Sequence, residues 1–199
     1  MSGKPISRFS VPALEDLPDD LRARIDAVAE KSGFVPNVFM ALARRPAELR
    51  AFFDYYDALM LRDGGLSKAE KEMIVVATSA ANQCPYCVIA HGALLRIFAK
   101  QPLLGDQVAI LYEKADVTER QRVMLDAALV LATKPQAFGE ADIECLLAAG
   151  FSDEDIWDIG AITAFFALSN RMAHLTDMQP NQEFYMMGRT PRPREEDHG

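Results

Sequence analysis

The chain has 199 residues, 50% of them apolar and 25% charged, which is enough to bury one full hydrophobic core. Its formal net charge of −8 argues against a nucleic-acid partner, because a strongly acidic protein offers no basic surface to phosphates. The N-terminus lacks an apolar signal segment, and no apolar run reaches the roughly 18 residues of a membrane span. We therefore expect a cytoplasmic protein with no membrane partner.

The first 61 residues predict an extended arm followed by three helices. Residues 1–17 contain two prolines and show no sustained periodicity. Apolar residues at helical spacing then predict helices over 18–31, 37–43 and 47–61. The last of these carries a broad apolar stripe, which is typical of a core helix.

A capping box marks the start of the next helix. Ser67 followed by Glu70 predicts a helix that begins at about Lys68. Glu72 lies one turn into it and shares a face with Val75, so its carboxylate is expected to point toward apolar packing. The alternative is an ordinary first-turn acid that stabilises the helix dipole.

A Cys-Pro-Tyr-Cys tetrad at 84–87 begins the following helix, which is predicted to run to about Lys100. With Cys84 as N-cap, Pro85 occupies the first helical position, where its missing N–H costs nothing. Residues three apart on a helix lie roughly 5 Å apart at Cα, which permits a disulfide between Cys84 and Cys87. His91 lies one turn beyond Cys87, on the same face. The helix dipole favours a thiolate at the Cys84 end.

The second half is predicted to be helical too, with helices over 106–112, 119–132 and 142–149. A second capping box, Thr118 with Gln121, precedes the helix over 119–132. Aligning the two capping boxes indicates a degenerate internal repeat.

The copy keeps the helical pattern but has lost the reactive residues, since Val123 stands where the first half has Glu72 and Pro135 where it has Cys84.

The last long helix begins after Ser152 and is apolar on nearly all sides. Its apolar residues are Ile156, Trp157, Ile159, Ile162, Phe165, Phe166 and Leu168. We expect full burial, in the core or against another subunit. Residues 186–199 are charged and proline-rich, which is typical of a disordered tail.

The combination of Glu72, Cys84-x-x-Cys87 and His91 resembles the active-site pattern of alkyl hydroperoxide reductase D-type (AhpD-like) proteins in the carboxymuconolactone decarboxylase superfamily. The resemblance extends to the Gly-Phe-Val-Pro-Asn segment at 33–37 and to Ser-Asn-Arg at 169–171, and it is strongest for the peroxidase-related branch. It implies an all-α, AhpD-like domain over residues 1–185, assembled as a homotrimer or homohexamer.

The resemblance also implies a peroxidase that reduces organic hydroperoxides through a Cys84–Cys87 disulfide. Cys87 would be the peroxidatic sulfur, and Cys84 the resolving sulfur that a lipoyl- or thioredoxin-like dithiol attacks first. Glu72 would act as base, through His91 or a water molecule. No cofactor and no metal are expected.

Tyr86 is a departure from the family, because well-known members have a histidine at this position. A shorter or weaker proton relay is the expected consequence. The Tyr86 phenol is either a packing group or a hydrogen-bond donor to a substrate oxygen or a sulfur.

Three alternatives remain from the sequence. Cys-Pro-Tyr-Cys is also the signature of glutaredoxin-like oxidoreductases, although about 80 mostly helical residues precede it here. Cys84, Cys87 and His91 could form a metal site, but the second ligand pair that such sites usually have is missing. Carboxymuconolactone decarboxylation is possible by descent, although that branch lacks the cysteine pair.

Two further reactive residues have simple structural interpretations. Cys145 lies between apolar residues on a predicted helix and is expected to be a small core residue. His174 follows the apolar part of the last helix and is expected to have a capping or surface role.

Overall fold

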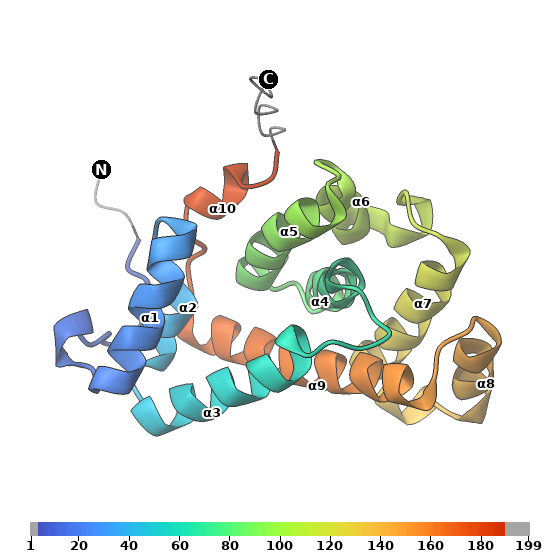
Figure 1. Ribbon diagram of the computed structural model, residues 1–199, viewed down its shortest axis with the longest axis horizontal. Helices are drawn as coiled ribbons and strands as arrows, with labels where there is room; N and C mark the ends of the chain where they lie inside the picture. The colour runs from blue at the N-terminus through green and yellow to red at the C-terminus, as the bar shows by residue number, and fades with distance from the viewer. Residues whose placement is uncertain (1–3, 190–199) are drawn as a thin grey trace, which may run out of the picture.

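The computed structural model describes residues 4–189, and this range contains helices and no strand (Figure 1). The all-α prediction is confirmed. A glutaredoxin-like fold is excluded for this part of the chain, because such a fold is built on a β-sheet.

Helix α4 (Lys68–Ala81) is the central element of the fold, seen nearly end-on in the middle of Figure 1. Around it lie α5 (Pro85–Ala99), α6 (Leu104–Leu111), α7 (Glu119–Thr133) and α9 (Asp153–Thr176), and all four pack against it. Every residue of α4 from 70 to 79 is buried as a result. A polar side chain on this helix must therefore find its partner inside the protein.

The remaining helices extend the fold at its two ends. They are α1 (Asp19–Ser32), α2 (Asn37–Leu42), α3 (Pro46–Tyr56), α8 (Glu140–Ala148) and α10 (Glu183–Met186). The sequence predicted α1, α2 and α8 to within two residues at each end. Gly33 ends α1 with a φ of 85°, a left-handed conformation that glycine adopts without strain.

Both predicted capping boxes are present, at Ser67 with Glu70 and at Thr118 with Gln121. In each box the first side chain accepts a hydrogen bond from the backbone N–H three residues later, and the side chain of that later residue accepts from the backbone N–H of the first. Helices α4 and α7 begin directly after these boxes and pack against each other, as the proposed repeat requires.

The single helix predicted over 47–61 is two segments in the structure. The α-helix gives way to a π-helical segment, Asp57–Leu61. Buried Lys71 donates from Nζ to the carbonyl oxygens of Leu59 and Arg62, both at 2.7 Å. This lysine supplies donors to carbonyls at the end of the π segment, which explains why a charged residue is tolerated inside the protein.

The N-terminal arm packs on its own chain. Arg8 N–H donates to the carbonyl of Thr176 at 2.8 Å, and Gln179 N–H donates to the carbonyl of Ile6 at 3.2 Å. The arm is thus anchored at the C-terminal end of α9, where it supports the segment that leads to α10.

Residues 186–189, which the sequence assigned to the tail, include groups that bond to the helical part of the chain. Arg189 forms an ion pair with Asp106 at 2.6 Å, and buried Arg96 donates to the carbonyl of Met187 at 2.9 Å. The rest of the predicted tail, 190–199, lies outside the described residues.

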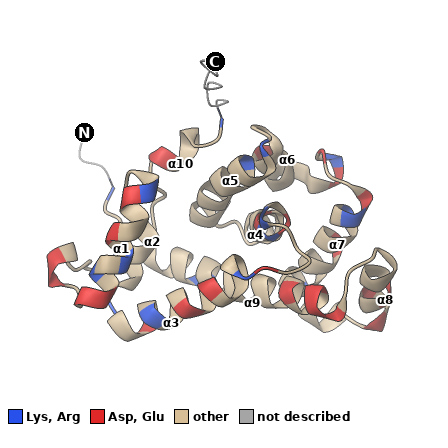
Figure 2. Cartoon of the chain, viewed as in Figure 1, with Lys and Arg blue, Asp and Glu red and all other residues tan. Residues whose placement is uncertain are grey.

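Helix α9 is buried on one face only in the single chain. Burial of its other face against another subunit, the second alternative that the sequence left open, stays a prediction. Ile162 and Phe166 face the core, whereas Trp157 is 74% exposed and Leu168 is 54% exposed. Residues 159–170 carry no charge, and the middle of α9 is accordingly tan in Figure 2. None of the helices in residues 4–189 combines the length and hydrophobicity needed to cross a membrane.

Replacing Lys71 by Met should lower the free energy of unfolding by about 2 kcal/mol, because a buried carbonyl would lose its donor. Urea denaturation measures this change. Lys68→Met is the matched control, since Lys68 is exposed on the same helix and its loss should change stability by less than about 0.5 kcal/mol. Equal effects of the two substitutions would contradict the role given to Lys71.

Candidate active site

Glu72 and His91 form a short hydrogen bond between α4 and α5. Oε2 of Glu72 lies 2.6 Å from Nδ1 of His91, and the carboxylate side chain is only 2% exposed. Phe166 of α9 packs edge-on against the imidazole, with ring centroids 4.6 Å apart. Glu72 therefore points into the protein as expected, and it is not a surface acid of the first helical turn.

The dithiol sits at the turn between α4 and α5. Gln83 has a φ of 54°, which reverses the chain, and Cys84 N–H then donates to the carbonyl of Ser79 at 2.9 Å. Cys84 is the N-cap of α5 with Pro85 at its first position, as predicted. Both Cys84 and Cys87 are buried, at 0% and 1% exposure.

The two thiols are electrostatically unequal. A hydrogen bond from Cys87 lowers the pKa of Cys84 to about 6, and the Cys87 backbone N–H adds to this effect. The same hydrogen bond raises the pKa of Cys87, and burial raises it further. The reduced pair therefore carries its first negative charge on Cys84, as the helix-dipole argument indicated.

Helix α9 contributes polar groups to the dithiol that the sequence did not identify as functional. Ser169 Oγ lies 3.8 Å from Cys87 Sγ. Asn170 Nδ2 donates to Ser79 Oγ at 2.9 Å, and its Oδ1 accepts from Asn82 Nδ2 at 3.0 Å. The Ser-Asn-Arg stretch noted in the sequence was the available signal, because it places two polar residues within a long apolar helix.

His174 caps the end of α4, which confirms the role expected for it. Its Nε2 lies 3.0 Å from the carbonyl oxygen of Asn82, the C-cap residue of α4. When protonated, His174 also helps to lower the pKa of Cys84. Its position near the dithiol is thus more specific than the sequence indicated.

Tyr86 connects α5 to α2. Its hydroxyl accepts a hydrogen bond from Val38 N–H at 3.1 Å, and burial raises the pKa of the phenol. The structure thus shows Tyr86 as a packing group whose oxygen is engaged by backbone, while the hydroxyl proton is still available to a second partner.

The prediction for Cys145 is wrong. Its side chain is exposed on α8 rather than buried in the core. The two turns of α8 around it bury only Leu146, so an apolar neighbourhood in sequence did not translate into burial.

The dithiol belongs to an apolar cluster. Phe34 and Phe184 pack edge-to-face with centroids 4.9 Å apart, and Phe184 also contacts Tyr86. Both phenylalanines belong to the apolar cluster that contains the two cysteines. Both sulfur-bearing side chains are therefore buried within an apolar cluster.

The metal alternative has no support in the geometry. Among residues 4–189, no group of three His, Cys, Asp or Glu side chains is arranged to hold a metal ion. Cys84, Cys87 and His91 are thus close in sequence without forming a ligand set.

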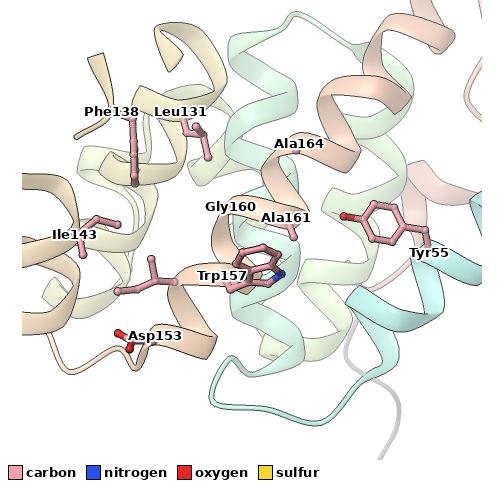
Figure 3. Close-up of a pocket in the computed structure, with 10 residues that line it drawn as sticks. Tyr55, Leu131, Phe138, Ile143, Asp153, Trp157, Gly160, Ala161 and Ala164 are labelled. Carbon is pink, nitrogen blue, oxygen red and sulfur yellow. The ribbon is translucent and has the colours of Figure 1, made fainter. Parts of the chain in front are cut away.

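An apolar groove lies on the outer face of α9, away from both cysteines. It encloses about 480 Å³, and Figure 3 shows Trp157 and Ala161 between Tyr55 on one side and Leu131 and Phe138 on the other. A second hollow of 540 Å³ continues it toward the C-terminal end of α9. We call the two together the α9 groove.

Comparisons with known proteins agree with this geometry. Residues 46–102 match the model of the carboxymuconolactone decarboxylase family. A peroxidase-related protein from Ralstonia eutropha JMP134, described as an alkylhydroperoxidase AhpD core, is 63% identical to this chain. The match covers 96% of this chain and 100% of that protein, and its TM-score is 0.94. The chain belongs to the AhpD-like proteins of the carboxymuconolactone decarboxylase family.

Two further solved structures share the fold at lower sequence identity. A peroxidase-related protein from Silicibacter sp. TM1040 is 41% identical over 95% of this chain and 99% of its own, with a TM-score of 0.89. A debrominase in complex with 2,3,4-tribromopyrrole is 20% identical to this chain, and the match covers 89% of this chain and 95% of the debrominase with a TM-score of 0.73. At this identity the likeness shows the fold alone. The comparison with curated proteins gave no match.

The AhpD-like dithiol should titrate in two separated steps. In a Cys145→Ser background, which removes the exposed third thiol, we expect the first thiolate to form at Cys84 with a pKa of about 6. The ultraviolet absorbance of thiolate, followed against pH in the reduced protein, measures this step. If the low-pH step disappears in Cys84→Ser, that step belongs to the Cys84 thiol. If the step persists in this variant, the assignment to Cys84 is wrong.

Proposed function

We propose that this protein reduces organic hydroperoxides and cycles between a Cys84–Cys87 dithiol and a disulfide. The observation that carries the proposal is the 2.6 Å Glu72–His91 hydrogen bond, one helical turn from Cys87. Cys87 holds its proton because burial and Cys84 raise its pKa, so it needs a base at the moment of reaction. The Glu72–His91 pair is such a base, acting directly or through a water molecule.

In the first step, the proton of Cys87 passes to the Glu72–His91 pair. The Cys87 sulfur attacks the outer peroxide oxygen, an S–O bond forms and the O–O bond breaks. The alkoxide that leaves takes the proton back and becomes an alcohol. Sulfur is thereby oxidised by two electrons to a sulfenic acid, and the peroxide is reduced by two.

In the second step, the Cys84 thiolate attacks the Cys87 sulfur. The S–S bond forms, the S–O bond breaks, and hydroxide leaves as water after taking one proton from solvent. One turnover therefore yields a disulfide, an alcohol and a water, with net uptake of one proton when Cys84 begins as thiolate.

A dithiol reductant of the lipoyl or thioredoxin type would complete the cycle by attacking the disulfide, at Cys84 in the assignment that the family resemblance implies. A cytoplasmic location fits this proposal, because a reducing compartment returns such a pair to the dithiol state.

Glu72→Gln should slow the oxidation of Cys87 by organic hydroperoxide about 10²- to 10⁴-fold, because general-base assistance is lost. His91→Ala should fall in the same range, and the double variant should be little worse than either single variant if the two act as one relay. Stopped-flow oxidation of the reduced protein, with one disulfide per chain as product, measures the rate.

Glu70→Gln is the matched control for this series. Glu70 is a buried carboxylate of the same helix, but it pairs with Arg120 at 2.6 Å and lies outside the dithiol network. Glu70→Gln should lower the free energy of unfolding and leave the rate of Cys87 oxidation unchanged. If Glu72→Gln oxidises as fast as Glu70→Gln, Glu72 is a structural acid and the relay is wrong.

The homotrimer or homohexamer expected from the family resemblance would bury the α9 groove. Trp157→Arg places a charge in it and should shift sedimentation toward the monomer at micromolar concentration. Ile110→Arg is the control, because Ile110 is 83% exposed on α6, outside the groove. A wild-type protein that sediments as a monomer would contradict this part of the proposal.

A further inference from the structure

Ser169 is a buried hydroxyl-bearing residue of α9 to which the proposed reaction gives no role. Its side chain belongs to the interior, and a buried hydroxyl is costly unless it finds a hydrogen-bond partner. Its Oγ lies 3.8 Å from Sγ of Cys87, within hydrogen-bond reach of a sulfur. Because Cys87 is the sulfur that attacks the peroxide in the proposed reaction, this hydroxyl touches a reacting atom.

The other buried hydroxyls of α9 are bonded within their own helix. Thr163 Oγ1 donates to the carbonyl oxygen of Ile159 at 2.8 Å. Thr176 Oγ1 donates to the carbonyl oxygen of Met172, also at 2.8 Å. Both bonds run to the residue four positions back, which is the usual arrangement for a hydroxyl inside a helix. Ser169 instead faces a sulfur on the neighbouring helix α5.

The contact between Ser169 and Cys87 is part of the packing of α9 on α5. Phe166, one turn before Ser169, packs edge-on against the His91 imidazole, with ring centroids 4.6 Å apart. Cys87 and His91 are likewise one turn apart on α5. Two successive positions on α9 therefore meet two successive positions on α5, and this packing holds the serine hydroxyl at the sulfur.

The chemistry of the two groups decides which of them donates the hydrogen bond. A thiol has one hydrogen, and in the reduced pair Cys87 directs it to Cys84. A thiolate has no hydrogen, so once Cys87 has lost its proton only the Ser169 O–H can donate. In agreement with this direction, the contact with Ser169 acts to lower the pKa of Cys87, against the larger effects of Cys84 and burial.

We propose that Ser169 is a further catalytic residue, whose hydroxyl donates a hydrogen bond to the Cys87 sulfur as the Glu72–His91 pair removes its proton. The inference rests on the proposed function, because it assigns a role within that reaction. The serine keeps its own proton throughout. The S–H bond of Cys87 breaks, the proton goes to the base, and the electron pair stays on the sulfur, where the hydroxyl stabilises it.

The hydroxyl favours the reaction because its hydrogen bond strengthens as charge forms on the sulfur. A hydrogen bond to a thiolate is stronger than one to a neutral thiol, and Cys87 rests as a thiol. An interaction that strengthens between the resting state and the attacking form lowers the barrier. The two groups thus have different tasks: the Glu72–His91 pair takes the proton, and Ser169 stabilises the charge that is left.

Several titratable groups surround the dithiol and stay unchanged in the test. They are Cys84, Tyr86 and His91 on α5, Glu72 on α4 and His174 on α9. Replacing Ser169 by alanine removes one hydroxyl, adds no charge and keeps a small side chain at the helix contact. A change in the behaviour of Cys87 therefore reports the lost hydroxyl.

The test uses Cys87 as the only thiol of the chain, in a background that carries Cys84→Ser and Cys145→Ser. In this background, Ser169→Ala should raise the apparent pKa of Cys87 by about one unit, as loss of a hydrogen bond to a charged group predicts. The pH dependence of alkylation by iodoacetamide measures this pKa. A change in access to the sulfur scales the alkylation rate equally at every pH and leaves the apparent pKa unchanged.

A second hydroxyl-free variant and a matched control complete this measurement. Ser169→Gly removes the same O–H and should raise the apparent pKa of Cys87 by the same amount. Thr163→Val removes a hydroxyl whose hydrogen bond stays within α9, and it should leave the pKa unchanged.

The oxidation rate shows whether the hydroxyl acts in the reaction itself. In the Cys145→Ser protein, which keeps both cysteines of the dithiol, Ser169→Ala should slow oxidation of Cys87 by organic hydroperoxide about three- to tenfold. A pKa one unit higher leaves about tenfold less thiolate, and the greater reactivity of a more basic thiolate offsets about threefold of this loss. Stopped-flow oxidation at neutral pH measures the rate.

Three outcomes would overturn the proposal: an unchanged pKa of Cys87 in both hydroxyl-free variants, a shift in only one of them, or equal oxidation rates with and without Ser169→Ala. The alkylation test uses no peroxide, so its failure is distinct from failure of the proposed function. That failure would appear as no oxidation of the wild-type dithiol by hydroperoxide.

Discussion

The burial of α4 on every side is the constraint on which the rest of the structure depends. Its apolar run, Met73 to Ala77, needs cover from several directions, and α5, α6, α7 and α9 supply it. A helix placed in this way can carry a polar group only if a neighbour satisfies it. Lys71 is satisfied by carbonyls at the end of the π segment, and Glu72 by His91. The site is thus a consequence of where α4 lies.

The same constraint explains why the dithiol is both buried and polarised. The turn at Gln83 folds α5 back onto α4, which brings Cys84 to the end of α4 and His91 beside Glu72. Burial alone would raise the pKa of both thiols. The hydrogen bond between them favours charge on Cys84, so one buried pair contains a thiolate and a thiol. These are the two forms that the proposed reaction uses.

The sequence predicted those parts of the fold and site that depend on local spacing. Capping boxes, the N-cap at Cys84 and the inward direction of Glu72 follow from positions three, four and seven residues apart. The prediction that failed concerns long-range packing, since Cys145 is exposed rather than buried in the core. Helical periodicity says which residues share a face, but it does not say what lies opposite that face. For the same reason, the contact between Ser169 of α9 and Cys87 of α5 could not be predicted from the sequence.

The position of α9 links the site to the outer surface. Its inner face supplies Phe166 to His91 and Ser169 to Cys87, while its outer face forms the α9 groove. Both faces belong to one helix, which has no proline and no glycine after Gly160. The residues that touch the imidazole and Cys87 and the residues that line the groove therefore belong to the same helix.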